Sequence, residues 1–209
     1  MRTTLLVLAL LLLGGCNARF KKAIATMDDV KSEAYTRTRP NVQLGMLYGN
    51  DVVSAVVNTA QAVGSIAVER RIEKAVDPRH VAGALQAGLG DGLGSGPPFR
   101  LSQRPKADGL VEMSVLDWGM SVPHLGSPGV FYYRVRARVY VPSGRRIYHR
   151  RVTCSTGVGA PREVSMVLGT VNNVKQIREM SDDQIEHAFE VTAHWCGTVI
   201  AQRMRRAGG

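Results

Sequence analysis

Arginine recurs at every second position in one segment of this 209-residue sequence, at Arg134, Arg136 and Arg138. Because neighbouring side chains of a β-strand point to opposite faces, this spacing places the three guanidinium groups on one face of a strand. A turn at 142–145 and a second strand add a histidine and a fourth arginine to the same face. The candidate anion-binding or partner-binding residues are therefore Arg134, Arg136, Arg138, His149 and Arg151.

The charge around these arginines is one-sided. From Trp118 to Arg162 the sequence has eight Arg and no Lys, Asp or Glu. Guanidinium groups bind carboxylates and phosphates through paired hydrogen bonds, so a surface that binds an anion or an acidic partner is one interpretation. The other is that Glu112 on the neighbouring strand, or carboxylates of the C-terminal half, neutralise the arginines while water solvates the rest. Both interpretations are open at this point.

No group of residues typical of a catalytic site stands out. The glycine-rich segment Gly88–Gly96 lacks the G-x-G-x-x-G spacing, and we interpret it as a flexible helix end. His187, Glu190 and His194 lie at steps of three and four, which would suit metal ligands, but without an H-E-x-x-H pattern a solvated helix face is the simpler interpretation. We therefore expect no metal, no cofactor and no enzymatic activity, with a wall-acting hydrolase as an alternative.

The N-terminus carries signals of export and lipid attachment. Arg2 precedes the apolar run Leu5–Leu13, whose nine residues are too short for a helix to cross a hydrocarbon core of ~30 Å. Leu13-Gly14-Gly15-Cys16 resembles the lipobox of bacterial lipoproteins. This resemblance implies cleavage before Cys16 and a lipid on its sulfur, and Asn17 in place of Asp points to the outer membrane. The mature protein would be anchored to a membrane without spanning it.

Two cysteines remain once Cys16 is assigned to the lipid. In an oxidising compartment, Cys154 and Cys196 predict a disulfide, with two free buried thiols as the alternative. Closing the 42 positions between them would stabilise the fold by about 4 kcal/mol in the chain-entropy model. A zinc site is disfavoured because neither cysteine has a second cysteine two to four residues away.

Alternating hydrophobicity predicts the strands that position these residues. They are Gly109–Trp118, Val130–Val141 and Arg146–Cys154, with an additional edge strand at Phe99–Gln103. The second and third form a hairpin, and pairing of Val141 with Arg146 would set Arg136 opposite Arg151. In this register Cys154 lies on the apolar face of the hairpin, where a packed helix would bring Cys196 to it.

Helices are predicted before and after these strands. Residues 51–76, rich in Ala and Val, favour a core helix over a surface helix that meets lipid or a partner. A second helix begins at Asp77 as N-cap with Pro78 in its first position. The C-terminal helix begins at Ser181, whose capping box includes Gln184, and runs to about residue 206. Residues 163–178 predict a helix, or a helix and a loop.

Together these elements predict an α+β fold: an antiparallel sheet of three or four strands with helices packed on one face. The predicted organisation is a signal peptide at 1–15, a lipidated tether at 16–43 and a periplasmic α+β domain at 44–209. Within and just after the tether we expect a helical stretch at Met27–Tyr35 and a short strand at Val42–Leu47.

This order of elements resembles small envelope lipoproteins, namely the auxiliary lipoproteins of ABC-type transport and relatives of the curli-assembly and penicillin-binding-protein activator lipoproteins, whose domains share a TolB-amino-terminal-like layout. The carriers of the resemblance are Cys16 with its lipobox, the Ala/Val-rich helix, Asp77-Pro78, the strand after Ala107-Asp108, the turn Pro142-Ser143-Gly144 and the helix start Ser181-Asp182-Asp183.

The resemblance implies a non-enzymatic accessory role in envelope transport or assembly. We therefore expect a lipid-anchored protein on the periplasmic side of the outer membrane that binds a protein partner. Direct binding of an anionic lipid or peptidoglycan through the arginines is the alternative. Because export removes the protein from the cytosol, we expect no nucleic-acid partner.

Overall fold

The computed structural model describes residues 18–36, 38–44, 65–94, 98–102, 107–122, 129–156, 177 and 179–208. Its elements in chain order are β1 (Asp29–Thr36), β2 (Asn41–Leu44), α3 (Pro78–Leu93), β3 (Arg100–Leu101), β4 (Gly109–Val122), β5 (Val130–Tyr140), β6 (Arg146–Ser155) and α6 (Asp182–Gly208). Residues 18–24 and 65–75 are also helical. Within these ranges no helix is both long and apolar enough to cross a membrane. Cys16, residues 51–64 and residues 163–176 lie outside the described residues.

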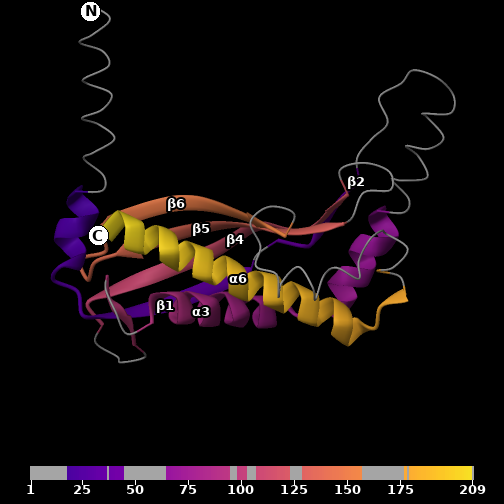
Figure 1. Cartoon of the computed structure of the whole chain (residues 1–209), viewed down its shortest axis with the longest axis horizontal. Coiled ribbons are helices and arrows are strands. Elements are labelled where there is room, and N and C mark those ends of the chain that lie inside the picture. Colours follow the sequence, from indigo (N-terminus) through magenta and orange to yellow (C-terminus); the bar gives the residue numbers. More distant parts are fainter. Residues whose placement is uncertain are drawn as a thin grey trace, which may run out of the picture.

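The sheet is mixed and has six strands, so the expectation of three or four antiparallel strands is wrong. Its order is β3-β1-β4-β5-β6, and β2 pairs with the far end of β4 (Figure 1). β4, β5 and β6 are antiparallel, whereas β1 and β2 run parallel to β4, and β3 runs parallel to β1. A parallel pair needs a long crossover, which the chain from β1 through α3 to β4 provides.

The described residues 18–36 and 38–44, where the sequence predicts a tether, pack into the folded domain. Phe20, Ile24 and Met27 are buried in the core, and the Phe20 ring lies 4.8 Å from the Tyr148 ring. The helical stretch predicted at Met27–Tyr35 is instead mostly strand β1. The reason is tertiary, because seven residues of β1 pair with β4 and Val30 is fully buried.

The arginine-bearing hairpin has nearly the predicted register. Arg136 lies opposite Arg151, and Tyr133 lies opposite Cys154, as expected. At the turn Arg146 pairs with Tyr140 instead of Val141, because a bulge inserts one extra residue into β6. The bulge leaves the two faces of the remaining hairpin as the alternation predicts.

Both predicted helix starts are confirmed. The Asp77 side chain accepts a hydrogen bond from the Arg79 backbone N–H at 2.8 Å, and Pro78 occupies the first position of α3. At α6 the Gln184 backbone N–H donates to Ser181 Oγ at 3.2 Å, and the Ser181 N–H donates to Gln184 Oε1 at 2.9 Å. These reciprocal bonds form the expected capping box.

Helices α3 and α6 lie side by side (Figure 1), in contact through glycines. Gly88 and Gly92, interpreted from the sequence as part of a flexible helix end, lie inside α3. A Cβ at Gly88 would lie 1.8 Å from His194 O, and one at Gly197 would lie 2.3 Å from Leu85 O. The two backbones therefore touch, which only residues without a side chain allow.

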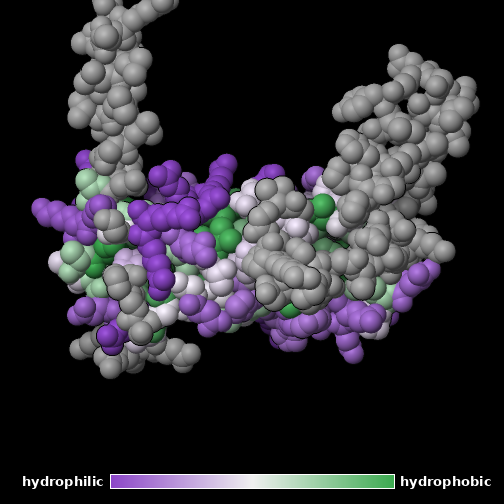
Figure 2. Space-filling model, in the orientation of Figure 1, coloured by the Kyte–Doolittle hydropathy of each residue, from purple (hydrophilic) through white to green (hydrophobic). Residues whose placement is uncertain are grey.

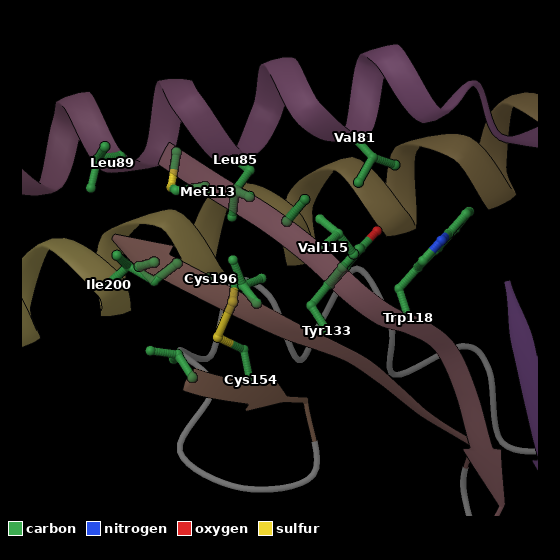
Figure 3. Packing of buried hydrophobic residues seen from close by; sticks show 14 of the residues in the cluster. Val81, Leu85, Leu89, Met113, Val115, Trp118, Tyr133, Cys154, Cys196 and Ile200 are labelled. Carbon is green, nitrogen blue, oxygen red and sulfur yellow. A yellow bond between two sulfur atoms is a disulfide. The ribbon is translucent and has the colours of Figure 1, made fainter. Parts of the chain in front are cut away.

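The core lies between one face of the sheet and these two helices. Figure 3 shows Leu85 of α3 and Cys196 of α6 directed towards Met113 of β4 and Cys154 of β6. The Cys154–Cys196 disulfide predicted from the sequence is confirmed, and both cysteines are buried. It joins the last helix to the edge strand β6.

Candidate functional site

The opposite face of the sheet carries the candidate residues. We call Arg134, Arg136, Arg138, His149 and Arg151 together the arginine face. The strand register brings all five onto one side of β5 and β6, away from the side that packs against α3 and α6. In Figure 2 hydrophilic side chains gather along the edge of the molecule where β6 lies.

Two cross-strand rows of this face contain their own carboxylates. Arg138 Nη1 donates to Glu112 Oε1 at 2.9 Å, and both side chains are about four-fifths buried, with 22% and 20% exposed. Arg134 Nη1 lies 3.9 Å from Asp117 Oδ2. The other carboxylate oxygen, Asp117 Oδ1, accepts a hydrogen bond from Tyr132 OH at 3.2 Å. The second interpretation of the sequence, that Glu112 neutralises an arginine of the neighbouring strand, is thus confirmed for Arg138.

The row between them has no acid. Across the strands it runs Tyr35, Ser114, Arg136 and Arg151, and Ser114 Oγ donates to Tyr35 OH at 2.8 Å. Within the described part of the chain no carboxylate lies within ion-pairing distance of Arg136 or Arg151. Like charges directly opposite each other repel, so this row is stabilised when an anion lies across it.

The arginines also change the protonation of His149. The pKa of His149 is lowered from its usual value of 6.5, first by partial loss of hydration and then by nearby positive charges. These charges belong to Arg146, Arg138, Arg136 and Arg151. The imidazole is therefore neutral at neutral pH, and the face has a positive potential produced by arginine alone. Burial and the charge of Asp117 raise the pKa of Tyr132, which keeps its hydroxyl a donor.

Two histidines join α3 to α6 on the other side of the molecule. His80 Nδ1 lies 2.9 Å from Glu186 Oε1 and 3.7 Å from Glu190 Oε1. His194 Nε2 lies 2.8 Å from Asp91 Oδ2. The structure therefore does not bring His187, Glu190 and His194 together as one solvated face or one ligand set: Glu190 and His194 contact α3 at separate places, and His187 is exposed.

Sequence reasoning missed several residues of these sites. Asp117 lies next to Arg134 because a bulge after Val115 shifts the register of β4, whereas Tyr132 shares the face of Arg134 through the alternation of β5. His80 and Glu186 are 106 positions apart, and nothing in the local pattern connects them. Cys16, the predicted lipid attachment site, lies outside the described residues.

A groove lies at the edge of the sheet between β1 and α3. Its lining includes Lys31, Glu33 and Gln86, and it contains neither histidine nor cysteine. Gln86 Nε2 donates to the backbone oxygen of Ser32 at 2.7 Å, so α3 satisfies one backbone acceptor of strand β1.

Comparisons with known proteins find solved structures at low identity and low TM-score. The sequence matches no family model, and no curated protein matches it. A solved structure from Xanthomonas campestris, of the family DUF330, is similar at 11% identity over 87% of this chain and 85% of its own, with a TM-score of 0.41. A hypothetical protein from Chlamydia trachomatis is similar at 15% identity over 88% and 94% of the two chains, with a TM-score of 0.32. A lipoprotein from Neisseria meningitidis is similar at 13% identity over 73% and 99%, with a TM-score of 0.27.

Proposed function

We propose that this protein is a lipid-anchored accessory protein of the cell envelope that acts by binding, without catalysis. Cys16 anchors it to the outer membrane on the periplasmic side, and the arginine face contacts acidic groups of a protein partner. The row of Tyr35, Ser114, Arg136 and Arg151 carries this proposal, because two opposed arginines have no carboxylate beside them in the described chain. The disulfide supports a location in an oxidising compartment.

The composition of the face favours a protein partner over a lipid or a wall polymer. Arginine and tyrosine are enriched at the centres of protein interfaces, and this row contains both residue types. The carboxylates of Glu112 and Asp117 flank it on both sides, so the face presents alternating charges instead of a uniform positive surface. A pattern of alternating charges allows a protein partner with complementary charges to bind in only one relative position.

Charge reversal at the two arginines without acidic neighbours tests this proposal. In R136E/R151E we expect recovery of the protein partner, after mild crosslinking and affinity purification, to fall at least about tenfold. The control K22E/R206E changes the net charge equally at exposed helical positions outside the sheet and should leave recovery unchanged. Binding to phosphatidylglycerol vesicles and to purified peptidoglycan is measured in parallel.

The outcomes separate the two kinds of partner. Loss of vesicle or peptidoglycan binding in R136E/R151E, with partner recovery intact, would instead establish the anionic polymer or lipid as the ligand. Equal behaviour of all three proteins would refute a role for the arginine face. As a second readout, partner binding should raise the pKa of His149 in an NMR titration, because an acidic group offsets the arginine charges that lower it.

A further inference from the structure

A second site of different chemistry lies between the helices. We propose that His80, Glu186 and Glu190 bind a divalent transition-metal ion, with zinc as the ion that suits the donor set best. His80 lies in the first turn of α3, and the two glutamates lie four residues apart on α6, one helical turn from each other. One ligand atom from each side chain lies within 4.8 Å of the others.

The donor chemistry is that of zinc proteins. Zinc accepts histidine nitrogen and glutamate oxygen at about 2.0–2.2 Å, and three protein ligands leave a fourth position for water. His80 Nδ1 already faces both carboxylates, at 2.9 Å from Glu186 Oε1 and 3.7 Å from Glu190 Oε1. The histidine side chain is 57% exposed, which gives an ion and its water access from solvent.

Charge favours a cation at this position. Two carboxylates converge here in a chain whose net charge is +10. His80 is the only basic side chain in the described residues within ion-pairing distance of either glutamate, and Arg79 next to it is bound to Asp77 instead, at 2.7 Å. A divalent ion would neutralise both carboxylates, which a single imidazole cannot do.

Glu186 is held in place before any ion binds, and so is the spacing of the two helices. The Asp77 backbone N–H donates to Glu186 Oε1 at 3.3 Å, and Asp77 itself is fixed as the N-cap of α3. Backbone contacts at Gly88 and Gly197 fix the distance between the two helices. Orienting hydrogen bonds of this kind are typical of the residues around metal ligands. The site lies in the helical layer, so it is independent of the arginine face and of the function proposed for it.

Zinc titration of the full chain, purified without a histidine tag, tests the proposal. We expect isothermal titration calorimetry to show one Zn²⁺ per chain, and zinc to raise the Tm. H80A and E190Q should each weaken Zn²⁺ binding at least about tenfold, since even residues outside the ligand shell contribute about 10- to 100-fold. Co²⁺ should give the visible absorption of a site with nitrogen and oxygen ligands, and E190Q should abolish it.

The matched controls are H194A, which removes the other histidine–carboxylate contact between the same helices, and H187A, which removes an exposed histidine of α6. Both should keep the affinity of the unmodified chain. E190Q retains the Asp77–Glu186 hydrogen bond, so it tests the site even where H80A disturbs the helix start. A folded chain that binds no zinc, or zinc binding that persists in both H80A and E190Q, would overturn the proposal.

Discussion

Replacing Gly88 with alanine should lower the free energy of unfolding by about 3 kcal/mol. The new Cβ would lie 1.8 Å from His194 O and 2.6 Å from His194 C, which are backbone atoms of α6 that cannot rotate away. The helices must separate, and the buried side chains between them and the sheet lose contact. Alanine's better helix propensity contributes only about 1 kcal/mol in the opposite direction. Denaturant unfolding followed by circular dichroism measures the difference.

Gly83 provides the matched control for this substitution. It lies in the same helix, and an added Cβ there would have no atom within 4 Å. Gly83→Ala should therefore stabilise the protein by up to about 1 kcal/mol, through helix propensity alone. Gly197→Ala, whose Cβ would lie 2.3 Å from Leu85 O, should behave like Gly88→Ala. Equal stability of the Gly88 and Gly83 variants would show that the two helices do not touch through their backbones.

Removing the disulfide in C154A/C196A should lower the free energy of unfolding by about 4 kcal/mol, from the chain entropy of closing a 42-residue separation. For a domain of this size the Tm should fall by roughly 10 °C. Thermal unfolding with and without a reductant measures the effect.

The reductant provides the control for the cysteine variant. Both cysteines are almost fully buried, so reduction has to be carried out under unfolding conditions before refolding. Reduced unmodified protein should then be about as unstable as C154A/C196A, while the variant itself should not respond to reductant. A reductant effect of the same size in both proteins would contradict this assignment of the stability to the Cys154–Cys196 bond.

The elements with strong local patterns could be predicted from the sequence. The hairpin register follows from the alternation of arginines with Val135, Ala137 and Val139, which leaves only one face able to enter the core. The start of α6 follows from its capping box, and the cysteine pairing follows from the faces on which Cys154 and Cys196 lie.

Elements that depend on distant parts of the chain could not be predicted. In β1 the outward positions are Lys31, Glu33 and Tyr35, so only burial against other segments distinguishes this strand from a polar tether. The parallel pairing of β1 with β4 leaves no local signal, and neither does the close contact of α3 with α6. For the same reason the cluster of His80 with Glu186 and Glu190 becomes visible only when the two helices are placed together.

Metabolic labelling with a palmitate analogue tests most directly whether this domain works outside the cytosol on a lipid anchor. The account predicts that the mature protein carries the label and fractionates with the outer membrane, and that a Cys16→Ala chain is unlabelled, keeps its leader and leaves that fraction. An unlabelled protein whose length and fractionation do not change with Cys16→Ala would contradict the anchor, the envelope location and the binding role built on them.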